Sequence, residues 1–184
     1  MHIVTQPLIG PFGWPKYENN KTELPINSGL YLTTFKFKDG FIPWGVGITN
    51  RPIRKRFLEH ARKFKHGEYN ILDLQSALTG QRVIAWKGWG WTDEKRKKFE
   101  ESKDQVINFS EKQFLETYIF IADLPKPIRL ERLESALTDH FHASGNVLID
   151  HGMQLSRRWK MEFPILVKFD AFQKIYGLPN EIQI

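Results

Sequence analysis

The chain of 184 residues contains no cysteine, which excludes disulfides, thiol nucleophiles and cysteine metal sites. It also lacks any run of about 20 apolar residues, the length that an α-helix needs to cross a bilayer, so no membrane partner is expected. The first twenty residues contain no basic segment followed by an apolar run, which argues against a secretory signal. These absences fit a cytoplasmic protein. The length of 184 residues predicts one domain with a substantial core.

The net charge of +6 is concentrated in one segment. Residues 51–66 contain seven lysines and arginines against the single acid Glu59, so the rest of the chain sums to zero. A neutral body with one basic helix is typical of a protein that binds a polyanion. A solvated basic face without a partner has the same pattern. The residues expected to contact nucleic-acid phosphates are Arg51, Arg54, Lys55, Arg62, Lys63 and Lys65.

Three segments have the alternation and the β-branched or aromatic content of strands. Residues 29–38 and 41–49 flank Asp39-Gly40, a strong turn signal, and predict a hairpin. Residues 114–123 predict a third strand, and FPILVKF near the C-terminus predicts one more.

The helix predictions depend on apolar residues spaced as on one helical face. A basic helix should begin near Pro52, with a buried stripe at Ile53, Phe57, Ala61 and Phe64. A second amphipathic helix is expected from about Ile128 to His142, with a stripe at Leu130, Leu133, Leu137 and Phe141. Asp93 to about Asp104 predicts an exposed charged helix, capped by Thr92.

This order of elements predicts an α+β fold, a compact sandwich with a central three-stranded antiparallel sheet flanked by helices, plus an insertion and a C-terminal strand. We expect a single domain over 1–184. Its expected parts are an irregular arm (1–27, rich in Pro, Gly and Asn), a motif core (29–66 and 114–146), an insertion (about 67–113) and a C-terminal extension (147–184).

Arg56 and His60 are one turn apart on the basic helix, at the edge of its buried stripe. A guanidinium and an imidazole held side by side suit a phosphate ester, because one can neutralise charge and the other can move a proton. Tyr31 on the first strand is a candidate phenol nearby. The alternatives are a surface arginine, a partly buried histidine bonded to backbone and a core tyrosine.

Glu134 is the most informative carboxylate, because it projects only about 40° from Leu130 on a helix with about 100° per residue. It therefore borders the apolar stripe, where a carboxylate is desolvated unless something compensates it. A bound divalent cation is one such compensation. An ion pair with Arg56 or another basic neighbour is the alternative.

Two other features are weaker candidates for a functional site. His140, His142 and His151 resemble a metal cluster, but His140 and His142 are about 200° apart on a helix, which argues against a shared ion. The segment Trp86–Trp91 could stack on unpaired or flipped bases, or it could pack within the protein.

The ordered set of motifs resembles the GIY-YIG nuclease superfamily. The resemblance rests on Gly29-Leu30-Tyr31, Val46-Gly47, Lys55-Arg56-Phe57 with His60, Glu131-Arg132-Leu133-Glu134 and Asn146. It spans residues 29 to 146, with a long insertion between the basic helix and the third strand.

The resemblance implies a metal-dependent DNA endonuclease, of a restriction or defence type that acts without further domains. It implies Mg²⁺ or Mn²⁺ held by Glu134, a phosphate-stabilising role for Arg56, and Tyr31 as general base with His60 beside it. Asn146 would help to order the site. Double-stranded DNA is the expected partner, and cutting both strands of a palindrome would favour a homodimer.

One departure from the family pattern leaves two readings open. The position of the family's second motif tyrosine is Gly45 here, so neither a phenol nor an amine is present there. Either Tyr31 and His60 suffice for cleavage, or the chain is a nucleic-acid-binding protein of the same fold with weak or lost catalysis.

Overall fold

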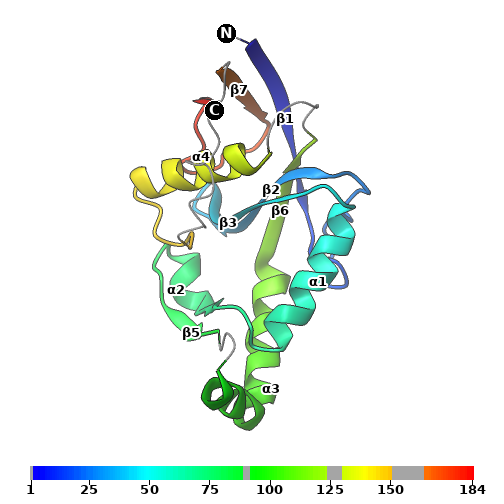
Figure 1. Ribbon diagram of the computed structural model, residues 1–184, viewed down its shortest axis with the longest axis vertical. Helices are drawn as coiled ribbons and strands as arrows, with labels where there is room; N and C mark the ends of the chain where they lie inside the picture. Colours follow the sequence, from blue (N-terminus) through cyan, green and yellow to red (C-terminus); the bar gives the residue numbers. More distant parts are fainter. Residues whose placement is uncertain (1, 89–91, 124–129, 151–163) are drawn as a thin grey trace.

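The structure, a computed structural model, describes residues 2–88, 92–123, 130–150 and 164–184. Its main element is a mixed six-stranded sheet that curls into a half-barrel, with the strand order β3-β2-β6-β1-β7-β8 (Figure 1). The strands are β1 (His2–Phe12), β2 (Gly29–Phe37), β3 (Gly40–Thr49), β6 (Thr117–Ala122), β7 (Ile165–Ala171) and β8 (Glu181–Gln183). A separate two-stranded sheet pairs β4 (Ile71–Leu72) with β5 (Ile84–Trp86).

The prediction of a central three-stranded antiparallel sheet is wrong, because the main sheet has six strands and is mixed. The three strands expected from alternation do exist as β2, β3 and β6, and they lie side by side and antiparallel. The sheet continues beyond them, however, because β1 pairs with β6 on one side and, in parallel, with β7 on the other.

Strand β1 also corrects the prediction of an irregular arm. His2 to Leu8 pair in register with Ile165 to Ala171, at the other end of the chain. The prolines in this segment, Pro7 and Pro11, lower its local strand propensity. Pairing with a distant partner overrides that local preference, and a partner more than 150 residues away leaves no local sequence signal.

Four helices are described: α1 (Ile53–Lys65), α2 (Leu74–Leu78), α3 (Asp93–Glu116) and α4 (Leu130–Ala143). The buried residues of α1 are those predicted from its stripe. In α4, Leu133, Leu137 and Phe141 are buried as predicted, whereas Leu130 is half-buried; Ile128, where this helix was expected to begin, lies outside the described residues. No helix in the described part of the chain is long and apolar enough to span a bilayer.

Helix α3 is longer than predicted and takes in residues 114–116, which were expected to begin a strand. The reason is helical periodicity at its buried positions, Phe99, Val106, Ser110, Gln113 and Phe114. Phe114 continues a helical stripe, and the switch to strand spacing comes only at Thr117.

The strands β2, β3 and β6 separate two hydrophobic clusters. Leu30 and Leu32 face α4, with Leu133 and Leu137 in the same cluster. Tyr31, between them in the sequence, faces α1 and α3 instead, as strand alternation requires. Figure 1 shows α4 on one side of these strands and α1 on the other. Residues from both sides can therefore meet only near an edge of the sheet, and β3 is an edge strand.

Candidate active site

Tyr31 occupies a gap that glycine leaves in the edge strand. It pairs across the hairpin with Gly47, and a Cβ at Gly47 would lie 2.3 Å from both Cζ and the hydroxyl oxygen of Tyr31. The ring therefore covers the backbone of Gly47, where any side chain would displace it. The hydroxyl oxygen reaches α1, where it lies 3.0 Å from Nε2 of His60.

Tyr31 and His60 are both neutral near pH 7. Burial raises the pKa of Tyr31 to about 12, although Arg56 opposes this shift by its charge and by hydrogen bonding. Burial also lowers the pKa of His60 to about 3, and the cations Arg56 and Lys63 act in the same direction. Because a neutral imidazole has one accepting nitrogen, the Tyr31 hydroxyl can donate to Nε2 when Nδ1 holds the ring proton.

Arg56 is one turn before His60 on α1, as the sequence predicted. Its guanidinium is half-buried and forms an ion pair of 3.6 Å with Glu59. Burial works against its charge, but Tyr31, Tyr69 and Glu59 outweigh that effect and raise the pKa of Arg56 above its ordinary value. It is a permanent cation beside the Tyr31 hydroxyl.

Glu134 comes from α4 and is half-buried, as its place at the edge of the apolar stripe predicted. Burial raises the pKa of its carboxyl to about 7, Glu131 adds to the shift, and Arg56 opposes it. Within the described ranges, no hydrogen bond or ion pair involves this carboxylate. The alternative of an ion pair between Glu134 and Arg56 is therefore not realised.

A divalent cation fits Glu134 by the chemistry of the donors. The described residues contain no group of three or more His, Asp or Glu side chains that could share a metal ion. Mg²⁺, however, is commonly held by one or two carboxylates, with water and substrate phosphates completing its shell. A desolvated carboxylate that has no hydrogen-bond or ion-pair partner within the described ranges suits that mode of binding. His140 and His142 form no such group, and His151 lies outside the described residues.

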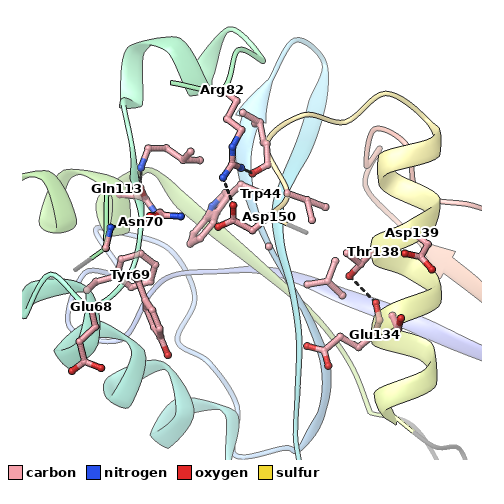
Figure 2. A pocket seen from close by; sticks show the side chains of 18 of the residues that line it. Trp44, Glu68, Tyr69, Asn70, Arg82, Gln113, Glu134, Thr138, Asp139 and Asp150 are labelled. Carbon is pink, nitrogen blue, oxygen red and sulfur yellow. Dashed lines mark hydrogen bonds and ion pairs between the residues drawn. The ribbon is translucent and has the colours of Figure 1, made fainter. Parts of the chain in front are cut away.

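A cavity of about 510 Å³ adjoins Glu134. Figure 2 shows Glu134, Thr138 and Asp139 on the α4 side of it, with Glu68 and Tyr69 opposite. The insertion supplies Asn70, Leu72, Arg82, Gly88 and Gln113 to its wall, and β3 supplies Trp44, Gly45 and Val46. Arg82 closes one end through an ion pair with Asp150 and a hydrogen bond of 2.6 Å to the Leu148 carbonyl oxygen.

Most of the cations predicted to contact phosphates, on α1 and just before it, already have carboxylate partners. Arg51 donates two hydrogen bonds to the Glu59 carboxylate, from Nη1 to Oε1 and from Nη2 to Oε2, each 2.9 Å long. The other paired cations are Arg54 with Glu18 and Glu23, Lys63 with Glu68, and Lys65 with Glu111. Lys55 and Arg62 are exposed and have no ion pair among the described residues. They are seven residues apart and so share one face of α1.

Comparison with family models, with curated proteins and with solved structures found no match. The arrangement of side chains is therefore the basis for any statement about activity.

Asn146 does not join Tyr31 and Arg56. Its side chain is buried, with Nδ2 donating to the Pro43 carbonyl oxygen at 2.8 Å and Oδ1 accepting from the Leu148 amide at 2.9 Å. It ties the turn after α4 to β3. Trp86 of the tryptophan segment is buried and donates to the Gly67 carbonyl oxygen at 2.9 Å; Trp89 and Trp91 lie outside the described residues.

Tyr69 lines the cavity and was not predicted from the sequence. It follows α1, and its ring centroid lies 5.8 Å from that of His60 and 5.0 Å from that of Phe64. Its hydroxyl is close enough to affect the pKa values of both Tyr31 and Arg56. No sequence motif marks Tyr69. Because Gly45 supplies no phenol, each of the five tyrosines of the chain is a candidate to provide one in its place.

Proposed function

We propose that this protein is a metal-dependent endonuclease that hydrolyses phosphodiester bonds in DNA, a restriction or defence nuclease of the GIY-YIG type. The observation that carries the proposal is the convergence of Tyr31 from β2, Arg56 and His60 from α1, and Glu134 from α4 around one edge of the sheet. A proton-accepting pair, a fixed cation and a desolvated carboxylate are the groups that phosphodiester hydrolysis needs.

In this proposal water attacks phosphorus in line with the leaving oxygen. The oxygen of Tyr31 takes the proton of the attacking water while the hydroxyl proton of Tyr31 passes to Nε2 of His60. Because burial lowers the pKa of His60 to about 3, Nε2 is unprotonated at neutral pH. The negative charge of the bound phosphate would stabilise the imidazolium that forms when Nε2 accepts this proton. The leaving oxygen takes its proton from solvent, and the products are a phosphate monoester and an alcohol.

Arg56 stabilises the charge that develops on the phosphoryl oxygens. Glu134 would hold Mg²⁺ or Mn²⁺, which supplies Lewis-acid stabilisation of the phosphate and of the leaving oxygen. Lys55 and Arg62 contact phosphates of double-stranded DNA along the exposed face of α1. The exposed ion pairs of its other cations are individually weak, so phosphates can compete for those cations. In this proposal two copies of the chain form a homodimer that cuts both strands of the DNA. The protein acts in the cytoplasm.

The proposal is tested by incubating supercoiled and linear DNA with the protein in Mg²⁺ or Mn²⁺. We expect Glu134→Gln to lose cleavage while it retains salt-sensitive DNA binding in EDTA. Cleavage that survives Glu134→Gln, or a wild-type protein that cuts no DNA in either metal, would contradict it.

The second candidate is a nucleic-acid-binding protein that does not cleave. It is favoured by the absence of a phenol at Gly45 and by the pKa of Tyr31 near 12, which makes the phenolate scarce at neutral pH. It predicts the same salt-sensitive binding to DNA in wild type and Glu134→Gln, with no product in either metal.

A further inference from the structure

Arg51 and Arg56 converge on one carboxylate oxygen of Glu59. Nη2 of Arg51 lies 2.9 Å from Oε2 of Glu59, and Nη1 of Arg56 lies 3.6 Å from the same atom. Arg51 also donates from Nη1 to Oε1 at 2.9 Å. Arg51 precedes α1, whereas Arg56 and Glu59 are one turn apart on the helix. Oε2 therefore marks a position at which two guanidinium groups from different segments can contact a single anionic oxygen.

This position is open to solvent and adjoins the candidate active site. The side chains of Arg51, Glu59 and Arg56 are 52%, 30% and 31% exposed, so a ligand can reach all three. Burial raises the pKa of Tyr31 and that of Glu134, and the charge of Arg56 opposes both shifts. An anion at the place of Oε2 would therefore lie beside the cation that the candidate active site uses.

Glu59 holds both arginines in a way that a ligand can replace. Burial raises the pKa of Glu59, but the hydrogen bond and charge of Arg51 and the charge of Arg56 outweigh it and lower this pKa below its ordinary value. Glu59 is therefore ionised near pH 7 and competes with any other anion for the two guanidinium groups. Ion pairs of exposed side chains contribute little to stability. Arginine binds phosphate through paired N–H groups, so a phosphate oxygen suits the place of Oε2.

We propose that Arg51 and Arg56 form a phosphate-binding site and that the Glu59 carboxylate is its built-in competitor. This inference rests on the nucleic-acid part of the proposed function. The phosphate displaces Glu59 and contacts both guanidinium groups. Because Glu59 is tethered to the same helix, its effective concentration is high, and a lone phosphate competes poorly. A nucleic acid competes better, because the exposed Lys55 and Arg62 bind further phosphates of the same strand.

A double-mutant cycle tests whether phosphate displaces Glu59. The affinity for one DNA duplex is measured by fluorescence anisotropy in EDTA at fixed salt, for wild type, Glu59→Gln, Arg51→Gln and the double variant. We expect Glu59→Gln to bind the duplex about fivefold more tightly than wild type. Arg51→Gln should weaken binding about threefold more in the Glu59→Gln protein than in wild type.

The sign of this coupling separates the proposal from a fixed ion pair. If phosphate displaces Glu59, Arg51→Gln in wild type loses a phosphate contact but also removes an ion pair that binding has to break, so its effect is small. If Glu59 stays on Arg51, Arg51→Gln leaves the Glu59 charge to repel the DNA, and its cost is larger in wild type than in Glu59→Gln. No coupling, or coupling of this second sign, would overturn the inference.

The same cycle with Arg56→Gln tests the second guanidinium. Its coupling to Glu59→Gln should have the same sign and be smaller, because Arg56 lies farther from Oε2 than Arg51 does. Its absence would overturn the two-arginine site. Glu59→Ala, which leaves no amide oxygen for Arg51, should reproduce both results.

Glu100→Gln is the matched control, because it also removes one negative charge, from an exposed position on α3. It should change the affinity less than Glu59→Gln does and show no coupling to Arg51→Gln. Coupling of equal size in this control would show a general effect of net charge and overturn the inference.

If no variant binds the duplex, the nucleic-acid function fails, and inorganic pyrophosphate decides the site by thermal shift. Stabilisation of Glu59→Gln by pyrophosphate that is lost on adding Arg51→Gln would keep the site for a free phosphate compound. No stabilisation would overturn it. The expected coupling without cleavage in Mg²⁺ or Mn²⁺ would leave the phosphate site standing and remove the nuclease.

Discussion

The hydroxyl oxygen of Tyr31 lies 3.0 Å from Nε2 of His60, and both side chains are far from their ordinary titration ranges. Burial is the largest cause for each, and it favours the neutral form of both. At neutral pH the hydrogen bond therefore joins two uncharged side chains.

His60 should remain neutral far below the usual pH for histidine. Because its folded-state pKa is depressed to about 3 from 6.5, its stabilising contribution is present above pH 6.5 and is lost as the pH falls toward 3. His60→Gln should therefore show a smaller fall in the free energy of unfolding between pH 6.5 and 4 than wild type. Urea unfolding measures this, and NMR of the ring protons checks that His60 does not titrate above about pH 5. An ordinary titration near pH 6.5 would contradict the burial argument.

Gly47→Ala should displace Tyr31, because the new Cβ would lie 2.3 Å from the phenol oxygen. A reacting group misplaced by about 1 Å can lower the rate about 100-fold, and we expect a loss of that order in DNA cleavage at unchanged DNA affinity. Ile48→Ala is the control: its side chain packs on the α4 side, so it should lower thermal stability and leave cleavage largely intact. Equal cleavage by Gly47→Ala and wild type would remove Tyr31 from the mechanism.

Much of the site was predictable because it depends on local periodicity. Alternation placed Tyr31 in a strand, the spacing from Ile53 to Phe64 gave the buried face of α1, and the helical angle put Glu134 at the edge of its stripe. The parallel pairing of β1 with β7 was not predictable, since it joins the two ends of the chain. Tyr69, Gln113 and Trp44 were missed for a related reason: long-range packing brings them to the cavity.

Glu134→Gln should stabilise the metal-free protein at pH 8 but not at pH 4. The pKa of Glu134 is raised to about 7 from 4.5, so the favourable protonated form is present below pH 4.5 and stability is lost as the pH rises through 7. The gain from the substitution should thus develop between pH 4.5 and 7 in urea unfolding with EDTA. Glu100→Gln, at an exposed position on α3, should show no such dependence. Mg²⁺ should stabilise wild type and have a smaller effect on Glu134→Gln; a gain that is the same at pH 4 and pH 8 would refute the prediction.

Tyr69→Phe should lower the cleavage rate while the protein stays as stable as wild type. The ring contacts with His60 and Phe64 remain, and the only group lost is the hydroxyl of a residue that lines the cavity opposite Glu134 (Figure 2). We expect kcat/KM to fall about tenfold or more, the lower part of the range for groups that assist proton transfer. Tyr118→Phe, on the other side of the sheet, is the control. Unchanged kcat/KM in Tyr69→Phe would show that this hydroxyl takes no part.

The exposed cations Lys55 and Arg62 of α1 should contribute more to DNA affinity than the paired Arg51, which precedes the helix. Lys55 and Arg62 have no ion pair among the described residues, whereas Arg51 is held by Glu59 at 2.9 Å through both nitrogens. A phosphate bound by a free cation releases one counterion, but a phosphate that captures Arg51 must first displace Glu59. Lys55→Gln and Arg62→Gln should each reduce the slope of log affinity against log salt by about 1. Arg51→Gln should change the slope less, because it also leaves the Glu59 carboxylate with fewer partners. Anisotropy titrations of one duplex over a range of salt concentrations give the three slopes. A slope change that is largest for Arg51→Gln would place the phosphate contacts at the segment before α1 and not at Lys55 and Arg62.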